Sequence, residues 1–350
     1  MEPATTEVPA VDLTKLIGRA ASGQRLSADE AEAAFVEVME GRATPVQLSA
    51  LLVALRVRGE TPQEIAGGVR ALRRAMIPVP APDDWVLVDT CGTGGGAVTT
   101  FNISTAAAFV AAGAGVHIAK HGNRSFTSRC GSADVLTALG VRIELTPEQM
   151  GSVLQRAGIV FMFAPLLHPA MRHVAPVRRE LAMPTIMNVL GPLTNPASAR
   201  RQVVGVSHPA LMELIAGALQ ELGHERALVV HGEPGLDEFS PIGITTVYEL
   251  LRGELIKYDV DPQTFGGAYH DAFEMRGLEP EQNAQLLVDV LQNRAPGVAR
   301  LAVTLNAGAA IYLGGKAESL REGWQLAEAS LADGSAMRAL ERLRVASHEV

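Results

Sequence analysis

The sequence has 350 residues, of which 47% are hydrophobic and 19% charged, and its formal net charge is −8 at pH 7. This length predicts two domains, and the composition is typical of a globular protein rather than a disordered one. The acidic balance argues against broad nucleic-acid binding, which needs a basic surface. It leaves room for a small phosphorylated ligand, which is bound by local donors.

Other features exclude further classes of protein. No apolar run approaches the roughly 20 residues that span a bilayer, and residues 1–10 lack the basic region and apolar core of a secretory signal. We therefore expect a cytoplasmic protein without membrane contact. Cys91 and Cys130 stand alone, without CxxC spacing, so neither a disulfide framework nor a structural zinc site is indicated.

Residues 11–76 show only helical signals. Ser27-Ala-Asp-Glu30, Thr44-Pro-Val-Gln47 and Thr61-Pro-Gln-Glu64 each read as a capped helix start, and apolar residues then recur at helical spacing. These amphipathic helices predict a small helical domain, and a dimer interface is one way to bury their apolar faces.

Beyond the proline-rich linker 77–84, strands alternate with helices, which predicts a mostly parallel sheet. A half-exposed pair of strands, 244–250 and 254–260, is predicted at the sheet edge. The other predicted strands are 86–89, 116–119, 141–145, 159–164, 203–207 and 227–231. Predicted helices are 103–112, 132–140, 146–158, 209–222, 282–292, 299–313 and 317–343.

The most informative stretch is CGTGGGAVTTFNIST, residues 91–105. Four of the five residues from Gly92 to Gly96 are glycine, so the backbone can approach a ligand closely. The loop joins a strand to a helix N-terminus, whose free N–H groups attract anions. The stretch therefore predicts a phosphate or pyrophosphate cradle.

Three further loops follow predicted strands, where ligands of open α/β sheets collect. The segment 120–136 is dense in donors, and the segment 168–180 is locally basic, with Pro169 and Pro176 predicting two short helical pieces. The third loop carries the adjacent acids Asp237 and Glu238, which suit Mg²⁺ beside phosphate oxygens. A solvated surface segment is the alternative for each of these loops, and for the acid pair taken alone it is the favoured one. The succession of the glycine loop and the donor-rich loop favours a functional site.

Familiar catalytic motifs are missing from the sequence. The glycines do not follow GxGxxG, no GK[ST] follows them, and neither HExxH nor GxSxG occurs. A site for phosphate, magnesium and a carboxylate without a nucleophile indicates group transfer by positioning and electrostatics.

Four separated motifs, GTGG…TFNIST, AKHGNRS…CGSADVL, HPAMRHVAPVRRE…NVLGPLTNP and HGEPGLDE, resemble those of the anthranilate phosphoribosyltransferase family, with LNAGAA as a weaker fifth. The resemblance implies transfer of a phosphoribosyl group from 5-phosphoribosyl 1-diphosphate (PRPP) to anthranilate, in tryptophan biosynthesis. It also implies the α/β fold of nucleoside phosphorylases and phosphoribosyltransferases, with a helical domain at 1–78, an α/β domain at 79–350, a segment near 174–198 that returns to the helical domain, and a homodimer.

The same resemblance implies the site residues. Arg178, Lys120 and Asn123 are the implied catalytic residues, Asn123, His168 and Arg178 contact anthranilate together with Gly92, and Ser104, Asp237 and Glu238 bind Mg²⁺. The implied substrate-binding residues, mostly PRPP ligands, are Gly92, Gly94, Gly95, Gly96, Thr100, Asn102, Ile103, Ser104, Thr105, Lys120, His121, Gly122, Asn123, Ser128, Ser132, His168 and Arg178.

One position departs from the family pattern. The family usually reads GTGGD, whereas this chain has Gly96 at the aspartate position. The missing carboxylate bears on the affinity for Mg²⁺ and PRPP and on the stiffness of the loop. A pyrimidine nucleoside phosphorylase and a non-catalytic nucleic-acid-binding relative share the fold and stay as alternatives. KHGNR and GLDE count against the first, and the acidic charge with the intact acid pair counts against the second.

Overall fold

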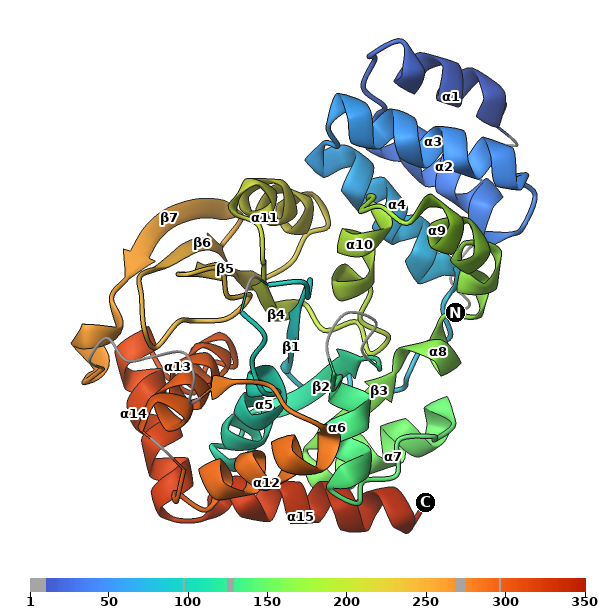
Figure 1. Ribbon diagram of the computed structural model, residues 1–350. Helices are drawn as coiled ribbons and strands as arrows, with labels where there is room; N and C mark the ends of the chain where they lie inside the picture. Colours follow the sequence, from blue (N-terminus) through green and yellow to red (C-terminus); the bar gives the residue numbers. More distant parts are fainter. Residues whose placement is uncertain (1–10, 97, 125–128, 268–274, 296) are drawn as a thin grey trace. The chain divides into compact units, whose positions relative to one another are not determined.

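The computed structural model describes residues 11–96, 98–124, 129–267, 275–295 and 297–350, which fold as two compact units (Figure 1). The first unit comprises Met1–Met76 and His168–Thr194. The second comprises Ile77–Leu167 and Asn195–Val350. The chain therefore leaves the second unit after Leu167 and re-enters it at Asn195. None of the helices in the described ranges is both long and apolar enough to cross a membrane.

The first unit is helical, and its helices begin where the sequence places caps. Ser27, Thr44 and Thr61 each form a capping box, which confirms the predicted starts of α2, α3 and α4. The helices of this unit are α1 (Leu13–Ala21), α2 (Ala28–Met39), α3 (Pro45–Arg58), α4 (Pro62–Ala75), η1 (Pro169–His173), α9 (Ala175–Leu181), α10 (Met187–Leu190) and η2 (Gly191–Leu193).

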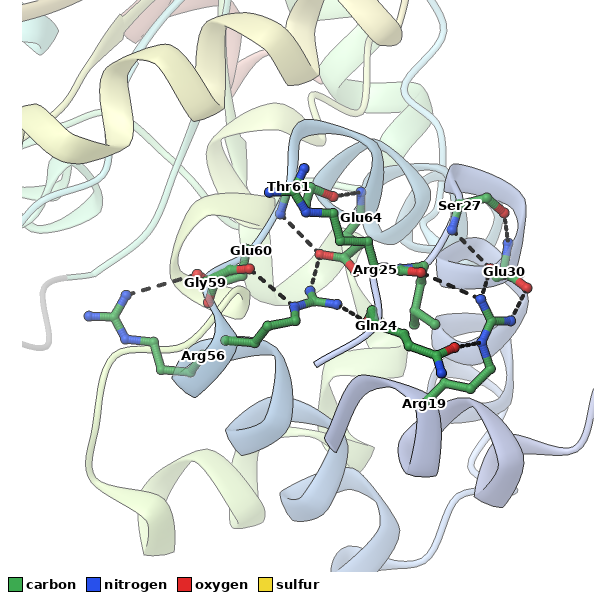
Figure 2. A network of polar contacts seen from close by, with 12 residues as sticks. Arg19, Gln24, Arg25, Ser27, Glu30, Arg56, Gly59, Glu60, Thr61 and Glu64 are labelled. Atoms are coloured by element: carbon green, nitrogen blue, oxygen red, sulfur yellow. Dashed lines mark hydrogen bonds and ion pairs between the residues drawn. The ribbon is translucent and has the colours of Figure 1, made fainter. Parts of the chain in front are cut away.

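A buried carboxylate joins the helices of the first unit (Figure 2). Glu64 has no exposed surface and accepts hydrogen bonds from the backbone N–H groups of Leu26, at 2.8 Å, and Thr61, at 3.0 Å. Arg58, at the end of α3, pairs with the same carboxylate. Glu64 therefore caps its own helix and holds α3 and the start of α2 against it.

The second unit contains a seven-stranded sheet in the order β3-β2-β1-β4-β5-β6-β7. The first five strands in this order run parallel, and β6 and β7 are antiparallel, which confirms the predicted edge pair. The strands are β1 (Leu87–Gly92), β2 (His117–Gly122), β3 (Ile159–Phe163), β4 (Arg201–Gly205), β5 (Arg226–Gly232), β6 (Thr245–Leu251) and β7 (Glu254–Val260).

Helices cover the sheet. The alanine-rich helix α5 follows β1 and is almost wholly buried, in contact with α13, α14 and α15, while α11 packs on β5 and β6 (Figure 1). The helices of this unit are α5 (Ile103–Gly113), α6 (Ser132–Ala138), α7 (Pro147–Ala157), α8 (Ala164–Leu167), η3 (Pro209–Leu211), α11 (Met212–Glu221), η4 (Pro262–Phe265), α12 (Pro280–Leu291), α13 (Gly297–Leu313), α14 (Leu320–Ala332) and α15 (Ser335–His348).

Two predicted elements are wrong. In residues 141–145, Val141, Ile143 and Leu145 are buried, but the segment belongs to no strand, and the N–H of Arg142 donates to a side chain of α15 instead. The predicted helix 317–343 is two helices, α14 and α15, separated at Gly334, whose φ of 75° no helix interior adopts.

Candidate active site

The loops with predicted ligands gather at the carboxyl ends of the parallel strands. Strand β1 lies between β2 and β4, so successive connections run outward from it in opposite directions. In open α/β sheets such a reversal point marks the ligand crevice. The glycine loop follows β1, the donor-rich loop follows β2, and the acid pair follows β5.

Two paired glycines lie directly against Asp237. Gly92 and Gly205 are partners at the ends of β1 and β4. A Cβ atom on Gly205 would lie 1.6 Å from the carbonyl oxygen of Asp237, and one on Gly92 would lie 2.5 Å from its Oδ2. A side chain at position 205 would displace the backbone of Asp237, so glycine is required there, and one at position 92 would displace the Asp237 carboxylate.

The glycine loop itself contacts this acid. The N–H of Gly94 donates to Oδ2 of Asp237 at 3.0 Å, and Gly94 and Gly95 have positive φ values of 67° and 77°. At Gly96, where the family has aspartate, a Cβ atom would lie 2.9 Å from the carbonyl oxygen of Gly235. In this chain the loop thus approaches the acid-bearing segment more closely than a side chain at position 96 allows.

The N-terminus of α5 places Ser104 beside Lys120. The Lys120 side chain is 4% exposed, and its Nζ donates to Oγ of Ser104 at 3.2 Å and to the carbonyl oxygen of Thr90. Burial lowers the pKa of Lys120, and the nearby carboxylate of Asp89 opposes this shift. The ammonium group is thus held between β1 and the start of α5, the two elements that the glycine loop joins.

Asp237 and Glu238 are adjacent, partly buried acids. Burial raises the pKa of Glu238 to about 8, the charge of Asp237 adds to this shift, and Lys120 and the backbone N–H of Ser104 oppose it. Burial likewise raises the pKa of Asp237. Within the described ranges no cluster of three His, Cys, Asp or Glu side chains forms, so the candidate ligands are these two carboxylates and the Ser104 hydroxyl. Such a set fits Mg²⁺, which uses one or two carboxylates together with water and substrate phosphates.

Other predicted PRPP residues play internal roles. The Asn102 side chain bonds the Cys130 carbonyl and the Asn283 amide, and Thr100 forms a β-bridge with Arg276. The side chains of Ile103 and Thr105 are buried in the core, 0% and 1% exposed, so at Ile103 only the backbone is available to a ligand.

The loop after β2 is compact where the structure describes it. The hydroxyl of Ser132 donates to the carbonyl oxygen of Asn123 at 3.2 Å, and a Cβ atom on Gly122 would lie 2.4 Å from that hydroxyl. The backbone N–H of His121 donates to Asp89 at 3.1 Å. Ser128 lies outside the described residues.

The basic element belongs to the first unit. It forms two short helices, η1 and α9, as predicted from Pro169 and Pro176. Burial lowers the pKa of His168 to about 4, so its imidazole is neutral at pH 7. Partial burial also lowers the pKa of Arg178, whose ordinary value is high enough for the guanidinium to stay charged.

Sequence reasoning missed a buried polar group beneath the site. Asp89, Asn195 and Gln202 are at most 1% exposed and are joined by hydrogen bonds. The available signals were weak: an acid inside the apolar strand VLVD, and a single Asn before Pro196. Neither signal shows, without the fold, that these residues are joined by hydrogen bonds.

Comparison with known proteins agrees with this geometry. Residues 84–337 match the model of the glycosyl transferase family a/b domain, and residues 14–76 match that family's helical bundle domain. An anthranilate phosphoribosyltransferase of Rubrobacter xylanophilus is 55% identical, over 94% of this chain and 96% of that protein.

Solved structures are similar over the same span. The anthranilate phosphoribosyltransferase of Thermus thermophilus is 44% identical, with a TM-score of 0.90 over 97% of this chain and 100% of that one. The Saccharomyces cerevisiae enzyme, solved in complex with PRPP and Mg, is 29% identical, with a TM-score of 0.88 over 97% and 98%. The chain belongs to the anthranilate phosphoribosyltransferase family.

Proposed function

We propose that this chain transfers the phosphoribosyl group of PRPP to the amine of anthranilate, giving N-(5-phosphoribosyl)anthranilate and diphosphate. The observation that carries the proposal is the grouping, at the strand ends of the second unit, of the glycine loop with Lys120, Ser104 and the Asp237–Glu238 pair. This group combines anion donors with hard oxygen ligands, which is the chemistry that a metal-bound diphosphate requires.

The leaving diphosphate is the species that this site would stabilise. The N–H groups of the glycine loop, the first turn of α5 and the Lys120 ammonium would bind its oxygens as negative charge develops there. Mg²⁺, held by Ser104, Asp237 and Glu238, would neutralise part of that charge when bound. Gly96 leaves the chain without the family's aspartate, so the carboxylates that we propose for the metal are those of Asp237 and Glu238.

Anthranilate would be held by its carboxylate. Arg178 offers a planar guanidinium that matches a carboxylate in geometry and charge, and the neutral imidazole of His168 and the amide of Asn123 offer further hydrogen bonds. Positioning the aromatic amine toward C1 of the ribose is then the main catalytic contribution. An aromatic amine attacks without a strong base, and we assign none.

A homodimer formed through the first unit is part of the same proposal. Val46 and Val57 on α3 are 78% and 80% exposed, and Ala50 and Val53 lie between them at spacings of four, three and four residues. These four residues, which we call the α3 stripe, form an apolar row on the side of α3 away from its buried leucines. A second copy of the chain would cover this row with an equivalent one. The cytoplasmic location stays a prediction.

The reaction can be followed by the loss of anthranilate fluorescence and the release of diphosphate, with PRPP, Mg²⁺ and the enzyme each omitted in turn. We expect both signals, in equal amounts, only in the complete mixture. Phosphorolysis of a pyrimidine nucleoside without anthranilate turnover would favour the phosphorylase alternative, and a shift of nucleic acid in a gel at physiological salt would favour the binding alternative.

A further inference from the structure

The backbone ladder between β1 and β2 ends before the two strands do, and we call this interruption the split. Strands β1 and β2 pair only at Leu87–His117 and Val88–Ile118, although they continue to Gly92 and Gly122. Over the same residues β1 stays paired with β4, and β2 stays paired with β3. Each strand therefore follows its outer neighbour, and the backbone ladder between β1 and β2 ends before the residues that carry the site.

Side chains take the place of the missing backbone bonds. Oδ1 of Asp89 on β1 accepts the N–H of His121 on β2 at 3.1 Å. Nδ2 of Asn195 donates to Oδ2 of Asp89 and to the carbonyl oxygen of Ala119 on β2, both at 2.8 Å. The Nζ of Lys120 crosses the split in the other direction, to the carbonyl oxygen of Thr90. The position of the β2 end relative to β1 thus depends on Asp89, Asn195 and Lys120.

Asp89 is suited to this role by having two acceptor oxygens. Besides the bonds from His121 and Asn195, its Oδ2 accepts Nε2 of Gln202 on β4 at 3.2 Å. Every one of these partners is a donor, and the carboxylate is fully buried. An asparagine at position 89 would have an NH₂ group in place of one of the two acceptor oxygens. This NH₂ group would face donors, and buried N–H groups would lose their acceptor.

The orientation of Asn195 is also fixed. Its Oδ1 accepts the backbone N–H of Ala197 at 2.9 Å, which leaves Nδ2 to face Asp89 and Ala119. Asn195 is the residue at which the chain re-enters the second unit. The re-entering segment is therefore anchored directly in the split.

From this network we propose that Asp89, held by Asn195 and Gln202, is a positioning residue for PRPP. It fixes the backbone of Lys120–Gly122 at the split, so that the Lys120 ammonium stays beside Ser104 at the start of α5. Asp89 has no exposed surface, so it would act without touching the ligand. This inference rests on the proposed function, because it assigns the anion at this site to PRPP.

Asp89→Asn tests the inference, with Glu249→Gln as the matched control. Glu249, on β6, is also a buried carboxylate, 7% exposed, and accepts hydrogen bonds from Tyr258 and Tyr312 at 2.9 and 2.8 Å.

PRPP binding in Mg²⁺ is measured by calorimetry, the PRPP KM by steady-state kinetics, and the folded state by thermal melting. We expect Asp89→Asn to weaken PRPP binding about tenfold or more, because the Lys120 ammonium would no longer be held in place and a small misplacement of a binding group is costly. Glu249→Gln should melt at a lower temperature and bind PRPP within about twofold of the wild type, because its bonds lie outside the split.

The possible outcomes distinguish a positioning role of Asp89 in PRPP binding from a general contribution to the stability of the fold. A merely structural role would lower the amount of active protein and leave the PRPP KM unchanged, and this result would overturn the inference. Equal weakening by both variants would overturn it as well. If Asp89→Asn does not fold, Asn195→Ala decides in the same assay, because it keeps the carboxylate and removes one donor from each side of the split. Failure of the wild type to bind PRPP would instead refute the proposed function, and the inference with it.

Discussion

At the scale of residues, burial distinguishes functional side chains from surface ones. Asp237 and Glu238 are adjacent loop acids in the sequence, a pattern that more often belongs to a solvated surface. The structure seats Asp237 on paired glycines and raises the pKa of Glu238 to about 8, mainly by burial. Motif spacing and family resemblance predicted these acids, but Asp89 and Asn195 could not be predicted, because their roles depend on where two strands separate.

Substitution of Arg178 tests the proposed contact with the carboxylate of anthranilate. Arg178→Ala should raise the anthranilate KM by about tenfold or more and leave the PRPP KM nearly unchanged, because a charged hydrogen bond to the carboxylate is lost. The neighbouring Arg179 is exposed, so Arg179→Ala is the matched control and should leave both constants unchanged. An unaltered anthranilate KM in Arg178→Ala would remove this residue from the site.

The raised pKa of Glu238 predicts how the stability of the folded chain depends on pH. Its pKa is about 8 in the folded chain, against an ordinary value of 4.5, so folding favours the protonated form. The stability that Glu238 contributes is present below the ordinary value and is lost as the pH rises through about 8. Without added metal, the melting temperature of the wild type should therefore fall more steeply between about pH 5 and 8 than that of Glu238→Gln, which resembles the protonated form.

The control for this measurement is Glu221→Gln, an exposed glutamate at the end of α11. Its melting curve should follow the wild type at each pH. Parallel pH profiles for the wild type and Glu238→Gln would show that Glu238 titrates as an ordinary surface acid.

At the scale of elements, local signals in the sequence were sufficient for capped helices and for most strands. The three capping boxes are formed as predicted, because Ser or Thr with Glu or Gln three residues later satisfies the first N–H groups locally. The strand predicted at residues 141–145 failed because alternating burial shows which side chains face the core and does not show whether the backbone pairs. The break at Gly334 was missed because apolar spacing continues on both of its sides.

Glu64 tests how the helices of the first unit are held together (Figure 2). Glu64→Ala leaves the Arg58 guanidinium and two backbone N–H groups without their acceptor, and should cost about 3 kcal/mol of unfolding free energy. Asp29, in a pair with Arg70 and 91% exposed, provides the contrast. Asp29→Ala should cost less than about 1 kcal/mol. Similar losses in both variants, measured by denaturant unfolding, would contradict the role given to Glu64.

At the scale of the whole molecule, the proposed dimer follows from the α3 stripe. Val57→Glu places a charge at one end of the α3 stripe, within the proposed contact, where burial without a partner is costly. The variant should sediment as a monomer at concentrations at which the wild type sediments as a dimer. Val345→Glu is the control, because Val345 is an exposed valine of the second unit, on α15. Identical sedimentation of the wild type and Val57→Glu would rule out this face.

In the proposed function, the strand ends of the second unit bind PRPP with Mg²⁺ through the glycine loop and the acid pair. A calorimetric titration with PRPP tests it most directly, using the wild type and Asp237→Asn, each with Mg²⁺ and with a chelator. We predict one Mg²⁺-dependent site in the wild type and, in Asp237→Asn, binding at least about tenfold weaker and less dependent on Mg²⁺. Equal PRPP affinity in the two proteins, or binding that the chelator does not change, would contradict the account.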